Sequence, residues 1–138
     1  MTLLYTARAT VTGGRDGKAE TDDGKLAITL SRPGGGGTGT NPEQLFAAGY
    51  AACFGGALSY VAGQRKLETG AITIHSEVTL NQNEQGFFIA AQLNVQMAGI
   101  DEKTGAVLVQ DAHKVCPYSK ATKGNITVTL KLNGKPVT

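Results

Sequence analysis

Alternation of polar and apolar residues predicts most of the strands in this chain. It is strongest at residues 72–80 and 87–97, which flank a polar turn at 83–86, the pattern of a hairpin with one buried face. Glycine-rich turns separate the shorter runs near the start of the chain. The predicted strands cover residues 2–11, 18–22, 25–30, 72–80, 87–97 and 125–132, the last of them ending at an Asn133-Gly134 turn.

Two segments have the pattern of helices instead. The first begins at Asn-Pro-Glu-Gln (41–44), where asparagine is a good N-cap, proline is harmless at the first helical position and glutamine can close a capping box. Apolar residues at helical spacing extend it to about residue 64. The second helix is capped by Asp101, covers about 102–114 and cannot continue unaltered through Pro117. Strands and helices together predict an α+β fold.

No charged residue occurs at 44–64, a segment long enough to raise the question of a membrane span. Four glycines, many alanines and the polar Tyr50, Ser59 and Tyr60 make it only mildly hydrophobic, so a helix packed inside the protein is favoured. A chain of 138 residues fits a single domain, residues 1–138. Such a chain is short for enclosing a long helix on all sides, which indicates that a second subunit supplies part of its cover.

Charge and composition narrow the classes of partner. The 13 basic and 11 acidic residues give a formal charge of +2, and no run of like charge indicates binding to nucleic acid or to a membrane surface. Small molecules and proteins are therefore the expected partners. The start of the chain lacks the basic flank, apolar run and cleavage site of a signal peptide, so we expect a cytoplasmic, reducing compartment.

The two cysteines, Cys53 and Cys116, are the strongest candidates for chemistry. Cys53 lies within the uncharged helix and Cys116 precedes a proline at a helix break, an arrangement that can carry thiol redox chemistry. The alternative for Cys53 alone is a small core side chain, because free cysteines are among the most often buried residues. An apolar helix interior would raise the pKa of Cys53, so it can react only if a cation is brought to it.

Arg15 is the candidate cation, because it lies in a glycine-flanked turn where a large side chain has no evident packing role. A solvated turn arginine is the alternative. Glu43 can hold the guanidinium in a bidentate pair, or it can stabilise the first turn of its helix through the helix dipole.

The remaining candidate residues have simpler readings. Two cysteines and two histidines would allow a zinc site by number, but no Cys-x-x-Cys pair exists and His75 falls on an exposed strand face, so we expect no metal. His113 is expected to interact with the C-terminus of its helix. Phe46 and Tyr118 can line an apolar pocket near the thiols or simply fill the core.

Two long segments carry a resemblance to a known family. Residues 41–54 read Asn-Pro-Glu-Gln-Leu-Phe-Ala-Ala-Gly-Tyr-Ala-Ala-Cys-Phe, and residues 115–126 read Val-Cys-Pro-Tyr-Ser-Lys-Ala-Thr-Lys-Gly-Asn-Ile. Both closely resemble the signature segments of the organic hydroperoxide resistance proteins, within the osmotically inducible protein C superfamily. The likeness covers nearly the whole chain, including Thr-Gly-Gly-Arg-Asp-Gly at 12–17. It departs modestly at Gly55, where a bulkier residue is common, and at Lys123, where arginine is common.

The resemblance implies a peroxidase of organic hydroperoxides, without metal, haem or other cofactor, working as an intertwined homodimer with antiparallel-rich sheets wrapped around central buried helices. It implies that Cys53 is the peroxidatic thiolate, Cys116 the resolving thiol, and Arg15 and Glu43 the pair that activates Cys53. Lipoylated proteins supply electrons to members of the family. The alternative from another class is a non-catalytic carrier of hydrophobic small molecules, with inert thiols.

Helix geometry separates Glu43 from Cys53. In one unbroken helix, ten residues place the two backbones about 15 Å apart and about 80° around the axis, too far for the carboxylate to touch the sulfur. We therefore expect either a break in the helix near Gly49 or a dimer in which elements of two chains meet at each site.

Overall fold

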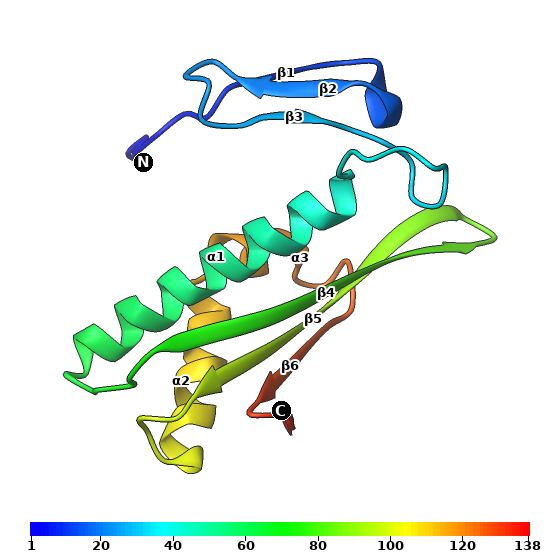
Figure 1. Cartoon of the computed structure of the whole chain (residues 1–138). Coiled ribbons are helices and arrows are strands. Elements are labelled where there is room, and N and C mark those ends of the chain that lie inside the picture. The colour runs from blue at the N-terminus through cyan, green and yellow to red at the C-terminus, as the bar shows by residue number, and fades with distance from the viewer. The chain divides into compact units, whose positions relative to one another are not determined.

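The computed structural model covers residues 1–138, which divide into two compact units, Met1–Leu45 and Phe46–Thr138. The first unit contains a three-stranded antiparallel sheet, and the second contains a four-stranded mixed sheet (Figure 1). With helices packed on the second sheet, the architecture is α+β, as the sequence pattern predicts. That the chain is a single domain stays a prediction.

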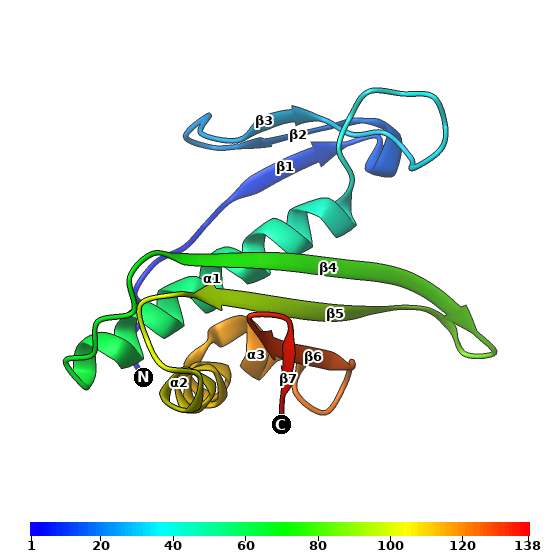
Figure 2. The same cartoon turned by 60° about the horizontal axis from the view of Figure 1, so that its bottom comes forward.

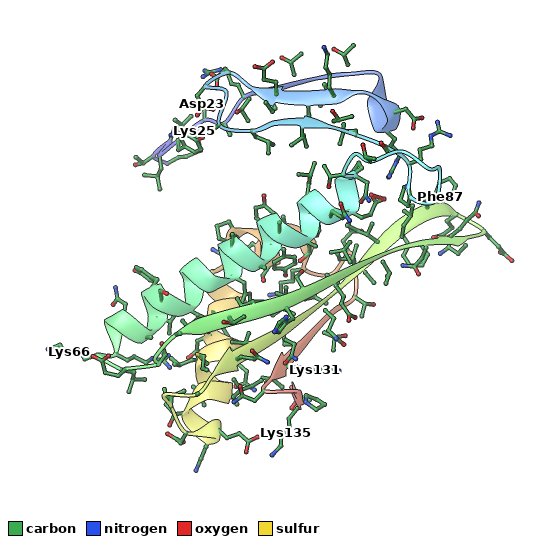
Figure 3. All side chains as sticks on the ribbon, in the orientation of Figure 1. Asp23, Lys25, Lys66, Phe87, Lys131 and Lys135 are labelled. Atoms are coloured by element: carbon green, nitrogen blue, oxygen red, sulfur yellow. The ribbon has the colours of Figure 1, made fainter.

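The sheet of the first unit is built from β1 (Ala9–Thr12), β2 (Lys18–Thr21) and β3 (Ala27–Thr29). Asp23 closes the β2–β3 turn, because its Oδ1 accepts hydrogen bonds from the Thr21 hydroxyl at 2.8 Å and from the Lys25 amide at 3.0 Å (Figure 3). The predicted first strand is wrong over residues 2–8. The pairing with β2 starts only at Ala9, opposite Thr21 where β2 ends, and all residues before it are exposed.

The sheet of the second unit has the order β4-β5-β6-β7. The predicted hairpin is confirmed as β4 (Ile72–Asn83) and β5 (Gly86–Met97), and the exposed Phe87 lies beside its turn (Figure 3). The predicted last strand is confirmed in part as β6 (Val128–Leu132), which pairs in parallel with β5. A further short strand, β7 (Lys135–Val137), follows the turn at 133–134 and was not predicted (Figure 2).

The helices begin where capping residues predict. In α1 (Pro42–Gln64), the Asn41 side chain accepts a hydrogen bond from the Gln44 amide at 2.9 Å. In α2 (Glu102–Val115), Asp101 accepts from the Thr104 amide at 3.0 Å. A third helix, α3 (Pro117–Thr122), was not predicted and starts directly after the break at Pro117.

The core of the second unit lies between one face of its sheet and the helices α1 and α2, and α1 runs along the β4–β5 hairpin (Figures 1 and 2). Alternate residues of β5 point into it, as expected for a sheet with one covered face. The largest fully buried side chains are Tyr50, Phe54, Leu58, Leu93, Val95, Met97, Leu108, Val109 and Leu132.

α1 is continuous from Pro42 to Gln64, so the expected break near Gly49 is wrong. Glycine is useful there for another reason: a Cβ at Gly49 would lie 3.2 Å from the Tyr118 hydroxyl oxygen. In the second unit the helix packs with one side on the core, and Ala48, Ala52 and Gly56 are exposed. By length and composition alone α1 is also suited to cross a membrane, a criterion that core helices of soluble proteins meet as well.

Candidate active site

Cys53 and Cys116 are in contact in the second unit. Cys53 comes from the middle of α1 and is partly exposed, whereas Cys116 lies between α2 and α3 and is fully buried. The Cys116 thiol donates a hydrogen bond to the Cys53 sulfur across 3.4 Å. Because the sulfur atoms of a disulfide are about 2.05 Å apart, a relative shift of about 1.4 Å would join the two.

Pro117 explains the position of Cys116. A residue before proline is disfavoured in the helical region, and Cys116 has the extended backbone angles φ −59° and ψ 122°. Its amide donates to the Ala112 carbonyl at 2.8 Å and closes α2, while its carbonyl accepts from the Lys120 amide at 3.0 Å and opens α3. Backbone bonds from two helices therefore fix the resolving candidate in place.

The surroundings of Cys53 favour the neutral thiol. Burial raises the pKa of Cys53, the backbone amide of Tyr118 lowers it, and the neighbouring Cys116 raises it. No basic side chain is among these influences. A thiolate at neutral pH therefore needs positive charge from another part of the protein, as the apolar sequence around Cys53 predicts.

Arg15 and Glu43 form a bidentate ion pair within the first unit. Nη1 of Arg15 donates to Oε2 of Glu43 at 3.0 Å, and Nη2 donates to Oε1 at 2.7 Å. The Glu43 side chain is 14% exposed and that of Arg15 is 42% exposed. The hydrogen bond from Arg15 lowers the pKa of Glu43, and the same bond raises the pKa of Arg15. The structure thus brings these two residues together, while their role toward Cys53 stays a prediction.

A tight glycine turn carries Arg15. The residue lies in the 3-10 helix η1 (Gly14–Asp16), and a Cβ on Gly17 would fall 1.6 Å from the Thr12 carbonyl oxygen, so only glycine fits there. Asp16 forms an ion pair with Arg32 at 2.7 Å, which connects the turn to the segment before the next glycine-rich loop.

Phe46 and Tyr118 belong to an aromatic cluster in the second unit. Their ring centroids are 6.0 Å apart, and the ring of Tyr50 lies 5.9 Å from Phe46 and 5.8 Å from Tyr118. Tyr50 is fully buried, but Tyr118 is 40% exposed. The cluster therefore fills core space and also presents an apolar surface, and the role of Phe46 and Tyr118 in a substrate pocket stays a prediction.

Sequence reasoning missed a buried polar group next to the cysteines. His113 was expected to interact with its helix C-terminus, but its Nδ1 lies 2.8 Å from Oγ of Ser119, and this oxygen lies 2.8 Å from the hydroxyl of Tyr50. Burial lowers the pKa of His113, and the charge of Lys123 lowers it further. The one sequence signal is the three-residue spacing of His113, Cys116 and Ser119, which is too common to carry a prediction.

No three His, Cys, Asp or Glu side chains are grouped so that they could hold a metal ion. His75 is exposed on β4, and His113 is engaged with Ser119. The zinc site that the residue count would allow is therefore not formed.

Comparisons with known proteins point to one family. The sequence model of the OsmC-like proteins matches residues 34–131. The organic hydroperoxide resistance protein of Xanthomonas axonopodis pv. citri is 53% identical over 135 residues, which are 94% of this chain and 95% of that protein. The crystal structure of the organic hydroperoxide resistance protein OhrB of Bacillus subtilis matches with a TM-score of 0.89 at 47% identity, over 94% of this chain and 99% of that chain. An organic hydroperoxide resistance protein of Legionella pneumophila matches with a TM-score of 0.91 at 44% identity, over 95% and 98% of the two chains.

Proposed function

Because this chain belongs to the OsmC-like protein family, and within it to the organic hydroperoxide resistance proteins, we propose that it is a cysteine-based peroxidase that reduces organic hydroperoxides to alcohols. The family itself indicates a role in the detoxification of organic hydroperoxides. The observation that carries the cysteine mechanism is the 3.4 Å contact between Cys53 and Cys116. Inert thiols in a carrier of small molecules would have no need to meet, so the contact favours a peroxidase over a carrier.

In the first step, the Cys53 thiolate attacks the outer oxygen of the hydroperoxide. An S–O bond forms, the O–O bond breaks, and the alkoxide leaves as an alcohol after taking a proton, so that Cys53 becomes a sulfenic acid. The guanidinium of Arg15, held by Glu43, stabilises the thiolate and the negative charge that develops on the leaving oxygen. The apolar rings of Phe46 and Tyr118 would receive the organic part of the substrate.

In the second step, the Cys116 sulfur condenses with the sulfenic acid. An S–S bond forms, the S–O bond breaks, and the hydroxyl leaves as water with the Cys116 proton. A dithiol reductant of the lipoyl type then attacks the disulfide, passes through a mixed disulfide and closes its own ring as it restores both thiols. The cycle needs neither a metal nor a cofactor.

We also propose that the protein acts as an intertwined homodimer in the cytoplasm. The uncovered side of α1 carries exposed small residues, and the segment before β1 carries the exposed Leu3, Leu4 and Tyr5, so both offer apolar surface to a second chain. Two arrangements were expected to bring Arg15 and Glu43 to Cys53, a break in the helix near Gly49 or a dimer. Because α1 is unbroken, the dimer is the one that remains.

The decisive experiment measures peroxide consumption by the purified protein with cumene hydroperoxide and dihydrolipoamide. Cys53→Ser should abolish turnover, whereas Cys116→Ser should consume one equivalent and leave a sulfenic acid at Cys53 that mass spectrometry detects as a dimedone adduct. Glutathione in place of dihydrolipoamide tests whether a dithiol is required. Full activity of the Cys53→Ser variant would end the proposal.

A further inference from the structure

A hydrogen-bonded chain, buried at Tyr50 and Ser119 and half-buried at His113, joins α1, which contains Cys53, to the two helices on either side of Cys116. Oη of Tyr50 in α1 lies 2.8 Å from Oγ of Ser119 in α3, and the same oxygen lies 2.8 Å from Nδ1 of His113 in α2. Tyr50 and Ser119 are 0% and 1% exposed. Thr122 stands beside them, with Oγ1 3.4 Å from the Tyr50 hydroxyl and 3.1 Å from the Ser119 carbonyl oxygen. We refer to Tyr50, Ser119 and His113 as the polar chain.

The members of the polar chain depend on one another, because Tyr50 and Ser119 are fully buried and aromatic rings pack beside Tyr50 and His113. The ring of Phe54 lies 6.4 Å from that of His113, and the Tyr50 ring packs in the aromatic cluster. A buried hydroxyl that loses its partner destabilises a protein by more than the bond itself contributes. With a neutral imidazole, Tyr50 donates to Ser119 and Ser119 donates to Nδ1 of His113, so that both hydroxyl groups have a partner.

The polar chain ends on the segment that faces Cys53. Ser119 follows Cys116 by one helical turn, and one of the two residues between them is Tyr118, whose backbone amide lowers the pKa of Cys53. α3 has only six residues, and a helix of that length does not persist without tertiary contacts. Whatever fixes Ser119 therefore also helps to fix the Cys116 thiol, which contacts the Cys53 sulfur.

We propose that Tyr50, Ser119 and His113 are positioning residues that hold Cys116 in bonding range of Cys53, so that the sulfenic acid becomes a disulfide before a second peroxide molecule oxidises it. The proposal rests on the proposed function for the sulfenic acid itself. The reaction that it speeds is balanced as above: the S–S bond forms, the S–O bond breaks, and water carries away the hydroxyl and the Cys116 proton. The polar chain takes up no proton and touches no substrate.

Tyr50→Phe is the sharpest test, because it removes one hydroxyl and keeps the ring that packs on Phe46 and Tyr118. Tyr60→Phe is the matched control, since the same atom is lost from an exposed position of the same helix. After one equivalent of cumene hydroperoxide, quenched samples are assayed over time for sulfenic acid, disulfide and sulfinic acid by mass spectrometry. We expect both variants to oxidise Cys53 at the wild-type rate, and Tyr50→Phe to form the disulfide about fivefold more slowly, the effect of losing one average hydrogen bond. Sulfinic acid should rise correspondingly in excess peroxide.

A second measurement separates this inference from the proposed function. Equilibration with reduced and oxidised glutathione forms the Cys53–Cys116 disulfide without any peroxide. We expect Tyr50→Phe to lower the equilibrium constant for forming this disulfide about fivefold, which raises its reduction potential by about 20 mV. Ser119→Ala, which removes two hydrogen bonds, should have a larger effect in both assays. If the wild type forms no sulfenic acid but the potential shifts, the proposed function fails and the positioning role stands. If folded Tyr50→Phe matches Tyr60→Phe in disulfide formation and potential, the positioning role is wrong.

Discussion

Oxidation of Cys53 and Cys116 to a disulfide should stabilise the protein against unfolding. The two residues are 63 positions apart, so the bond closes a long loop in the unfolded chain. The loss of chain entropy for a loop of that length corresponds to about 4 kcal/mol at 25 °C. The sulfur atoms already lie 3.4 Å apart in the folded protein, so only a small part of this gain should be lost to distortion of the native structure.

The gain should be visible as a shift in Tm. Unfolding entropies of globular proteins are about 2.1 cal/mol/K per residue, so 138 residues convert 2 to 4 kcal/mol into a rise of about 7 to 14 °C. Differential scanning calorimetry would compare protein treated with one equivalent of cumene hydroperoxide and protein kept in a phosphine reductant, at one protein concentration. Thiol titration should find no free thiol in the first sample and two per chain in the second. The Cys116→Ser variant is the control and should gain no comparable stability on oxidation.

The free energy by which the disulfide stabilises the fold also sets its reduction potential. Free energy that the disulfide adds to folding must be supplied again by the reductant, and about 30 mV corresponds to 1.4 kcal/mol for a two-electron couple. A gain of about 4 kcal/mol would thus place the reduction potential of the Cys53–Cys116 disulfide about 90 mV below that of an unconstrained pair of cysteines. A strongly reducing dithiol is therefore the expected reductant. An oxidised protein that has lost both thiols within one chain, yet has an unchanged or lower Tm, would refute the view that the folded chain holds the pair ready to bond.

Three further predictions follow from the site. The rings of Phe46 and Tyr118 are proposed to receive the organic part of the substrate, and each buried methylene contributes about 0.8 kcal/mol. We therefore expect kcat/KM for cumene hydroperoxide to exceed that for hydrogen peroxide at least about 100-fold, and similar values would contradict the proposed apolar pocket. Arg15→Ala and Glu43→Ala should each raise the pKa of Cys53, measured by thiolate absorbance, and slow peroxide reduction about 100-fold with a non-additive double variant; an unchanged titration would remove the activating role. Burial lowers the pKa of His113 from 6.5, so the unfolded chain binds a proton that the folded chain does not. The free energy of unfolding in urea should therefore fall as the pH drops from 7 through 6.5 and level off below the folded pKa, and a His113→Gln variant should lose this slope.

Local signals predicted much of the fold. The Asn41 and Asp101 caps start their helices as expected, and the alternation at 72–80 and 87–97 gives the long hairpin. These features depend on residues within a few positions of each other, where spacing and side-chain chemistry suffice.

Features set by distant residues could not be predicted in the same way. The parallel pairing of β5 with β6 joins segments separated by two helices, and the hydrogen bond between Tyr50 and Ser119 spans 69 positions. α3 and β7 are too short to show a period. At the candidate site, the cysteines were found by their chemistry and their neighbours in sequence, but the polar chain consists of ordinary side chains whose meaning comes only from where the fold places them.

The two cysteines differ in burial, which agrees with the different roles proposed for them. Cys53 is partly exposed, whereas Cys116 is fully buried behind the contact with Cys53 and has no exposed surface. The burial of Cys116 also keeps a bulky hydroperoxide away from its sulfur. The proposed order of the reaction, with oxidation at Cys53 before condensation with Cys116, therefore agrees with the unequal burial of the two sulfur atoms.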